Sequence, residues 1–157
     1  DAPVESREET SKYTDVLDNG IARKWTWAMD AKSVVTSPSP QSPITHGTGP
    51  LVISGLAWTG RGTITRVDVS KDGGKTWETA RLAKEGEKMA LTRFYLDTEW
   101  DGSEMMLQSR AMDDTGYIQP SKAQLREVRG LNSIYHNNCI QTWLVRSNGE
   151  AENVEVS

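Results

Sequence analysis

The sequence predicts an all-β fold, namely an immunoglobulin-like (E-set type) antiparallel β-sandwich that follows an irregular or short helical N-terminal arm. Short segments in which apolar and polar side chains alternate recur along the chain, and a period of two is typical of half-buried strands. Turns that carry Gly or Asp separate these segments at regular intervals. Helical periodicity is almost absent, so the pattern favours a sandwich.

The chain opens with a polar and charged segment, residues 1–20, for which two conformations are expected. One is a short helix whose first turn is capped by Ser6 and Glu9, and the other is an extended arm that lies on another surface. Residues 21–30 then alternate in the manner of a half-buried strand, with Trp27 on the apolar face. The sandwich is therefore expected to begin at this strand.

Strands and turns are expected to alternate from here to the end of the chain. Residues 37–50 hold four of the six prolines, which cannot donate to a ladder, so this segment is expected to form a loop. Most of the six tryptophans are expected in the core, and one or two in a subunit interface. The other expected strands are residues 33–36, 51–58, 63–70, 76–82, 90–96, 105–112, 140–146 and, more weakly, 153–156.

Length and composition exclude several classes of function. A chain of 157 residues suffices for one domain with a substantial core. The net charge is −4 and no block of Lys and Arg forms a basic face, which argues against nucleic-acid binding. No apolar run approaches the roughly 20 residues of a membrane-spanning helix. The chain begins without Met or a signal peptide, so we expect a processed chain or part of a longer protein.

The cysteine and histidine content argues against a metal centre within the chain. Cys139 is the only cysteine, which excludes an internal disulfide and a thiol-rich metal site. The two histidines, His46 and His136, lack the spacing of a ligand pair. Because no Lys or Arg adjoins Cys139 in the sequence, we expect a small buried hydrophobe without a chemical role.

Residues 70–77, SKDGGKTW, fit the Ser-x-Asp-x-Gly-x-Thr-Trp pattern of the Asp-box, which recurs on the blades of sialidase-type β-propellers. A single copy in a chain of this length cannot build a propeller of four or more blades. We therefore expect a structural hairpin in which Asp72 accepts backbone N–H groups and Trp77 packs under the turn. Gly73 and Gly74 would supply the positive φ angles.

A longer window around this hairpin resembles a known family. Residues 54–82, SGLAWTGRGTITRVDVSKDGGKTWETARL, are similar to the start of the dimerisation domain of sulfite-oxidase-type molybdenum enzymes. Residues 109–120 and 128–139 resemble two further segments of the family in the same order. Within the family, residues 7–15 and 133–143 look most like the molybdenum subunit of the sulfane dehydrogenases. The matching positions in the first window are Ala57, Trp58, Gly60, Arg61, 66–70, Asp72, Gly73, Gly74 and Trp77.

The resemblance implies a domain arrangement and an activity. Residues 21–157 would form the immunoglobulin-like dimerisation domain, and residues 1–20 would link it to a preceding molybdopterin domain. That domain would hold the cofactor, with a Cys thiolate on molybdenum, so this chain alone would bind no cofactor and be inactive. The parent enzyme is expected to be a periplasmic homodimer. It would oxidise a sulfur oxyanion or carrier-bound sulfane sulfur and pass electrons to a c-type cytochrome subunit.

The candidate site residues are mostly arginines. In the family, an arginine on the loop that carries Arg61 reaches an anion-binding pocket beside molybdenum, and a guanidinium fork suits a sulfur oxyanion. The loop here is one residue shorter, so a solvated loop arginine is the alternative. Arg129 and His136 match or lie near the family's Arg-Gly segment, and we expect them at an interdomain contact or interface. Arg66 and Arg110 are expected to form surface salt bridges.

Other functions stay open from the residues alone. One is a non-catalytic immunoglobulin-like binding module, which the sequence that precedes Asp1 would distinguish. A less favoured one is an Asp-box glycosidase, which needs further Asp-boxes, an arginine cluster and a Tyr nucleophile with a carboxylate partner. Within the family, the alternatives are an ordinary sulfite dehydrogenase and a nitrate-reductase relative.

Overall fold

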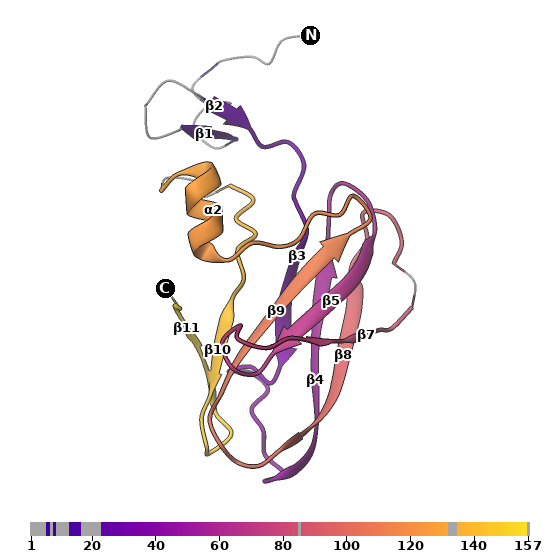
Figure 1. Ribbon diagram of the computed structural model, residues 1–157, viewed down its shortest axis with the longest axis vertical. Helices are drawn as coiled ribbons and strands as arrows, with labels where there is room; N and C mark the ends of the chain where they lie inside the picture. Colours follow the sequence, from indigo (N-terminus) through magenta and orange to yellow (C-terminus); the bar gives the residue numbers. More distant parts are fainter. Residues whose placement is uncertain are drawn as a thin grey trace.

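The computed structural model is a β-sandwich that carries a two-stranded ribbon and a helix near one end (Figure 1). The strands pair antiparallel within each described sheet, which confirms the predicted fold class. The structure describes residues 6, 8, 13–16, 23–84, 86–131 and 135–156.

The described strands form two sandwich sheets, with the orders β3-β4-β8-β7 and β11-β10-β9-β5-β6. The first contains β3 (Lys32–Ser37), β4 (Gly49–Trp58), β7 (Arg81–Leu82) and β8 (Thr92–Trp100). The second contains β5 (Ile64–Ser70), β6 (Glu78–Thr79), β9 (Met105–Asp113), β10 (Thr142–Val145) and β11 (Ala151–Val154). Apart from the segment 76–82, the predicted strands from residue 33 onward are confirmed, with shifts of a few residues at their ends.

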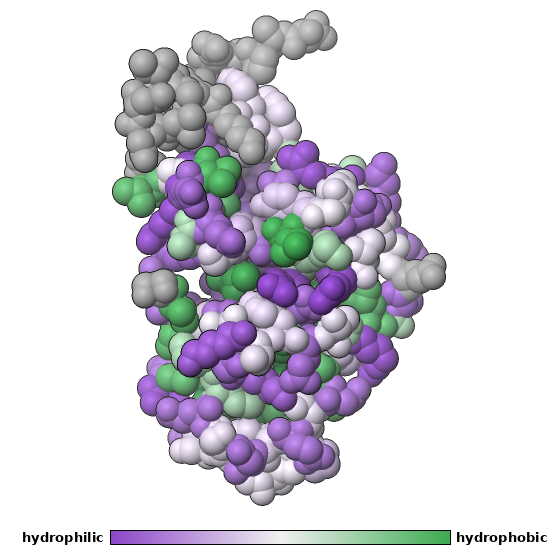
Figure 2. Space-filling model, in the orientation of Figure 1, coloured by the Kyte–Doolittle hydropathy of each residue, from purple (hydrophilic) through white to green (hydrophobic). Residues whose placement is uncertain are grey.

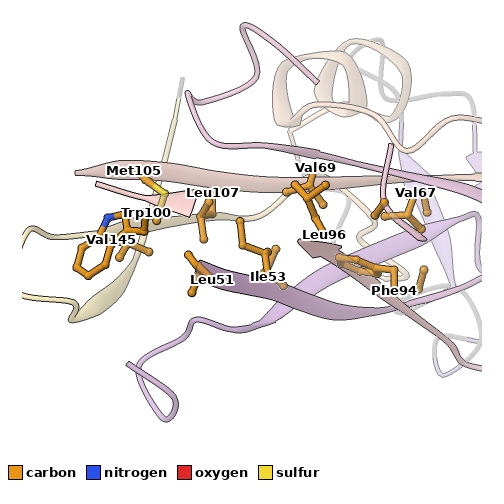
Figure 3. Packing of buried hydrophobic residues seen from close by; sticks show 14 of the residues in the cluster. Leu51, Ile53, Val67, Val69, Phe94, Leu96, Trp100, Met105, Leu107 and Val145 are labelled. Atoms are coloured by element: carbon orange, nitrogen blue, oxygen red, sulfur yellow. The ribbon is translucent and has the colours of Figure 1, made fainter. Parts of the chain in front are cut away.

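The hydrophobic core fills the space between the two sheets. Figure 3 shows side chains of β4 and β8 facing those of β5, β9 and β10. The fully buried side chains include Ile53, Val67, Phe94, Leu107 and Val145. They come from five different strands, so removal of their apolar surface from water stabilises the packing of one sheet on the other.

A buried amide also joins the two sheets. The side chain of Gln119 is 2% exposed, and its Oε1 accepts the backbone N–H groups of Ser33 (2.8 Å) and Ala111 (3.1 Å). Its Nε2 donates to the Ser33 carbonyl at 3.3 Å. Ser33 lies in β3 and Ala111 in β9, so one satisfied polar group fixes the position of an edge strand against the opposite sheet.

The prediction of one strand over residues 76–82 is wrong. The first half of the segment forms β6 against β5, and the second half forms β7 against β8. Between them the Ala80 N–H donates to the Val67 carbonyl at 2.8 Å, and Ala80 is buried. The chain therefore crosses from one sheet to the other at this residue. Sequence alternation cannot reveal the crossing, because both halves are extended.

The ribbon consists of β1 (Thr14–Val16) and β2 (Arg23–Trp25), and the predicted strand 21–30 is correspondingly shorter. Thr14–Val16 belong to the expected arm and are strand, so a helix does not extend this far. Glu9, one of the two predicted capping residues, lies outside the described residues.

The predicted faces of this strand are also reversed after residue 25. Thr26 is buried, because its N–H (2.8 Å) and its hydroxyl (3.0 Å) both donate to the Tyr13 carbonyl. Trp27 is 60% exposed and stacks on Trp25, with 5.2 Å between the ring centroids. Hydrogen bonding by Thr26 thus decides which side chain is buried here, although Trp27 is the more apolar of the two.

The prediction that most tryptophans lie in the core is wrong. Trp100 is 4% exposed, and Trp143 is partly buried and packs against the core cluster. The others belong to the ribbon, the end of β4 and the hairpin. Those that are only partly buried there are Trp25, Trp58 and Trp77.

Helix α2 (Lys122–Arg129) is absent from the sequence prediction. Ser121 and Gln124 form a capping box, in which the Gln124 N–H donates to Ser121 Oγ (3.2 Å) and the Ser121 N–H to Gln124 Oε1 (2.9 Å). Leu125 is buried, and Gly130 ends the helix with a φ of 77°. The Ser-x-x-Gln signal is present in the sequence, but the helix is too short to show a clear period.

The surface is largely hydrophilic on the face that Figure 2 shows, with apolar residues in separate spots. In the described part of the chain, no helix is long and apolar enough to cross a bilayer. Among the described residues, the exposed large apolar side chains are Trp27, Val52, Met89, Leu91, Ile118, Val128 and Leu131.

Candidate functional site

The hairpin 70–77 has the geometry of a self-supporting turn. Asp72 Oδ1 accepts the backbone N–H of Thr76 at 2.9 Å, and Oδ2 accepts its hydroxyl at 2.6 Å. Gly73 and Gly74 have φ angles of 73° and 92°, which suit glycine. The hydrogen bonds from Thr76 hold the pKa of Asp72 well below its ordinary value.

Trp77 connects this turn to the neighbouring strands. Its Nε1 donates to the Gly74 carbonyl at 3.0 Å, and the Arg110 guanidinium lies 4.2 Å from the ring centroid. Arg110 and Arg66 both donate to the buried carboxylate of Asp68, at 3.2 and 2.7 Å. These two arginines therefore form the salt bridges expected from the sequence.

A buried carboxylate fixes the loop that carries Arg61. Asp113 is 1% exposed, and its Oδ2 accepts the hydroxyl of Thr59 at 2.8 Å. Thr59 Oγ1 in turn accepts the backbone N–H of Arg61 at 3.2 Å. Asp113 Oδ1 accepts the Thr115 hydroxyl (2.5 Å) and the Tyr117 N–H (3.3 Å). One side chain thus joins the loop between β4 and β5 to the turn after β9.

Two glycines let this loop approach its neighbours closely. A Cβ on Gly62 would lie 1.9 Å from Asp114 Oδ1, and a Cβ on Gly60 would lie 3.0 Å from the Met29 nitrogen. The Gly60 N–H donates to the Met29 carbonyl at 2.8 Å. The segment around Met29 and the loop around Arg61 are therefore held together by their backbones.

Arg61 forms an ion pair with Asp30 across this contact. Arg61 Nε lies 2.5 Å from Asp30 Oδ1, and the two side chains are 46% and 19% exposed. The guanidinium is therefore neither buried nor free in solvent, and it lies beside a carboxylate that the sequence analysis does not single out.

Arg129 holds three separate segments together. Its Nε and Nη2 donate to the two carboxylate oxygens of Asp15, at 2.6 and 3.1 Å, and both side chains are nearly completely buried. Nη2 also donates to the carbonyl of Tyr135 (2.6 Å), and Nη1 to that of His136 (3.2 Å). This guanidinium thus connects β1, the end of α2 and the segment that precedes β10.

His136 lies beside this ion pair and has a φ of 50°. Its pKa is lowered, first because burial disfavours the imidazolium and then because Arg129 is close, while Asp30 opposes the shift. Its ring contacts the ring of Tyr135, with 4.1 Å between centroids. The structure brings His136 and Arg129 together, whereas the hairpin 70–77 packs beside β9, where the Gly73 N–H donates to the Met106 carbonyl at 2.9 Å.

Three carboxylates that are not among the predicted site residues organise this end of the molecule, namely Asp15, Asp30 and Asp113. Asp113 opens the stretch Asp-Asp-Thr-Gly-Tyr, whose Asp, Thr and Gly are a turn signal. Asp30 pairs with a residue 31 positions away, and Asp15 with one 114 positions away. No local pattern in the sequence marks partners at such separations.

The comparisons with known proteins agree with this geometry. A family model described as the Mo-co oxidoreductase dimerisation domain matches residues 23–143. The chain belongs to this family. The match confirms the resemblance drawn from the sequence, and it covers the loop of Arg61, α2 and the sandwich strands as far as the start of β10.

Relatives of this dimerisation domain are sulfur-oxidising enzymes. The chain is 35% identical over 118 residues to "Sulfite oxidase" of Gallus gallus, and 33% identical over 121 residues to "Sulfite oxidase, mitochondrial" of Rattus norvegicus. These alignments cover 69% and 70% of this chain. They cover only 25% and 21% of the relatives, so the chain spans about a quarter of their length.

A solved structure is more similar still. The crystal structure of the sulfane dehydrogenase SoxCD from Paracoccus pantotrophus contains a chain that is 69% identical and superposes with a TM-score of 0.92. The match covers 98% of this chain and 40% of that one. At this identity the likeness extends beyond the fold to the side chains of the domain.

The described residues do not fit a molybdenum centre of their own. They contain no group of three or more His, Cys, Asp and Glu side chains that could hold a metal. The thiol of Cys139 is buried, as expected, and its Sγ accepts from Gln141 Nε2 at 3.4 Å. This dimerisation domain can therefore offer an anion a guanidinium, but the described part of it offers molybdenum no ligand set.

The Arg129–Asp15 pair gives a prediction for stability. Arg129→Met leaves the Asp15 carboxylate buried without a partner, so the free energy of unfolding should fall by about 3–5 kcal/mol. Replacing both residues, as Asp15→Leu with Arg129→Met, removes the unpaired charge and should recover much of the loss. Urea unfolding of the three variants measures this. Equal stability of Arg129→Met and wild type would contradict the buried pair.

The Asp113 network gives a prediction for pH dependence. Burial raises the pKa of Asp113, but the bonds from Thr115, Thr59 and two backbone N–H groups outweigh it and lower the pKa below 3.8. A lowered folded-state pKa adds stability above pH 3.8 that is lost as the pH falls through this value and below.

Asp113→Asn should therefore cost about 1–3 kcal/mol at pH 7, since the amide cannot accept all of these bonds. Its stability difference from wild type should shrink as the pH falls below 3.8, because the unfolded wild-type chain then binds a proton that the folded carboxylate resists. Unfolding curves from pH 7 to pH 3 test this, with Asp97→Asn as the control because Asp97 is exposed. A difference that stays constant with pH would refute the assignment.

Proposed function

We propose that this chain is the dimerisation domain of a molybdenum-dependent enzyme that oxidises sulfur compounds, and that this enzyme is a sulfane dehydrogenase. The observation that carries the proposal is the 69% identity to a chain of the sulfane dehydrogenase SoxCD, over 98% of this chain. The substrate would be carrier-bound sulfane sulfur or a sulfur oxyanion. The domain would contribute subunit contact and one substrate-binding side chain, and would be inactive alone.

The remaining parts of this enzyme lie outside the domain. Residues 1–20 would be the linker from a preceding molybdopterin domain, and residues 21–157 the dimerisation domain. Molybdopterin would supply the redox centre, and a c-type cytochrome subunit would accept the electrons in the periplasm. The two-subunit name of SoxCD supports a partner subunit.

Arg61 is the residue of this chain that we propose binds the substrate anion. Its loop is fixed by Asp113 through Thr59, and its guanidinium is 46% exposed. A guanidinium donates from several N–H groups in one plane, which matches two oxygens of a sulfur oxyanion. A rigid loop supports this role, because a side chain held before binding loses less entropy when the ligand arrives.

Arg129 and His136 would hold the interdomain contact. Arg129 binds Asp15, which lies in the proposed linker, so its buried ion pair would fix the direction in which the linker enters this domain. His136 contacts the ring of Tyr135, which in turn contacts Tyr13 of the proposed linker with 4.5 Å between the ring centroids. The hairpin of Asp72, Gly73, Gly74 and Trp77 would be structural.

A sulfite dehydrogenase is the second candidate, and the sulfite oxidases among the relatives favour it. Their identity of 33–35% is about half of that to the SoxCD chain, which favours the sulfane assignment. Rates of the full-length enzyme with free sulfite and with carrier-bound sulfane sulfur separate the two. Rapid turnover of free sulfite without turnover of sulfane sulfur would refute the first candidate.

Self-association follows from the proposed role. Because the domain belongs to a dimerisation family, the chain should sediment as a dimer at micromolar concentrations. Sedimentation velocity over a concentration series measures this. A monomer at every accessible concentration would count against the proposal.

Substrate affinity follows from the proposed role of Arg61. In the full-length enzyme, Arg61→Ala should raise KM for the anionic substrate roughly 10- to 100-fold, the cost of one or two charged hydrogen bonds. Arg61→Lys keeps the charge without the planar fork of donors, so its KM should lie between those of the wild type and Arg61→Ala. Tm should change little, since the side chain is half exposed. An unchanged KM in both variants would make Arg61 a solvated loop residue.

A further inference from the structure

Asp30 contacts Arg61 in a way that leaves part of the guanidinium open. Arg61 Nε donates to Asp30 Oδ1, whereas the two Nη nitrogens have no hydrogen-bond partner among the described residues. A guanidinium can offer its Nη1–Nη2 edge to two oxygens at once. The ion pair therefore uses the Nε–H of Arg61 and leaves the Nη1–Nη2 edge of the guanidinium available for a ligand.

Both partners of this ion pair are fixed to each other by their backbones. The Gly60 N–H donates to the Met29 carbonyl at 2.8 Å, and Trp58 Nε1 donates to Met29 Sδ at 2.6 Å. On the other side, Thr59 accepts the Arg61 N–H and donates to the buried Asp113. Met29 is thus joined to the loop 58–61 by hydrogen bonds, which place the adjacent Asp30 beside Arg61.

We propose that Asp30 is a positioning residue, which holds the Arg61 guanidinium by its Nε so that the Nη edge binds two oxygens of the substrate anion. The inference rests on the proposed role of Arg61 in anion binding. It assigns to Asp30 the orientation of the cation rather than any contact with the substrate. A side chain that is oriented before binding pays less conformational entropy on binding, which raises affinity.

Two roles of the Asp30 carboxylate, repulsion of the anion and orientation of Arg61, predict opposite effects of its removal on substrate binding. If the carboxylate only repelled the anion, its removal would strengthen binding. If it orients Arg61, its removal weakens binding, because the arginine then samples many rotamers. Three variants separate these effects. Asp30→Ala removes the acceptor and the charge, Asp30→Asn keeps an acceptor without the charge, and Asp30→Glu keeps the charge but displaces the oxygen by one methylene.

The experiment uses the full-length enzyme and measures KM, kcat and the affinity for sulfate, a non-reacting probe, by calorimetry. Asp30→Ala and Asp30→Glu should each raise KM and the sulfate Kd by roughly three- to tenfold with kcat nearly unchanged. Asp30→Asn should change KM and the sulfate Kd less than the other two variants. A fall in KM for Asp30→Ala, or Asp30→Glu indistinguishable from wild type, would overturn the inference.

A double-mutant cycle tests whether Asp30 acts through Arg61. In the Arg61→Ala background, Asp30→Ala should have no further effect on KM or on sulfate binding. An equal effect in both backgrounds would overturn the inference. Asp97→Ala is the matched control, since Asp97 also pairs with an arginine at the surface, on the outer side of β8. It should leave KM unchanged.

The cycle also separates the inference from the proposed function. If Arg61→Ala raises KM and Asp30→Ala does not, Arg61 binds the anion and only the positioning role of Asp30 fails. If Arg61→Ala leaves KM and sulfate affinity unchanged, the anion-binding role fails and the inference falls with it. The Tm of each variant is measured to check that it is folded. If Asp30→Ala is unstable, Asp30→Asn and Asp30→Glu still test the inference.

Discussion

The buried carboxylate of Asp113 is the contact on which the geometry of the candidate site depends. It receives hydrogen bonds from two chain segments that belong to different turns, and it is almost inaccessible to water. Burying a charge is costly unless donors surround it, and here hydroxyl and amide groups do so. The position of Thr59, and through it that of Arg61, is therefore set by the sandwich rather than by the loop itself.

A second buried charge, Arg129, connects β1, the end of α2 and the segment that precedes β10. Its guanidinium donates to a carboxylate and to two carbonyl groups on segments far apart in the sequence. Replacing it with an apolar residue would remove this specificity even if stability were restored. The ribbon and the segment before β10 are thus tied to α2 by polar contacts, whereas the sandwich itself is held by an apolar core.

The sequence was sufficient to predict the sandwich but not the contacts that form the candidate site. Alternating strands such as β4 and β8 bury every second residue along most of their length against a common core, and this period is visible locally. The structure departs from prediction where a single polar contact decides, as at Thr26, or where the chain changes sheet, as at Ala80. Arg61 was accessible only through resemblance to a family, while its partner Asp30 carried no signal, since an ion pair between distant segments leaves no local pattern.

The crossing of the chain at Ala80 has a consequence for how the domain avoids unwanted association. It makes β6 and β7 the edge strands of the two sheets on one side, and each is only two residues long. An edge this short exposes too few unpaired N–H and C=O groups to template the strand of another molecule. Neither β6 nor β7 is therefore a good template for edge-to-edge aggregation, whereas the longer strands β3 and β11 form the edges on the opposite flank.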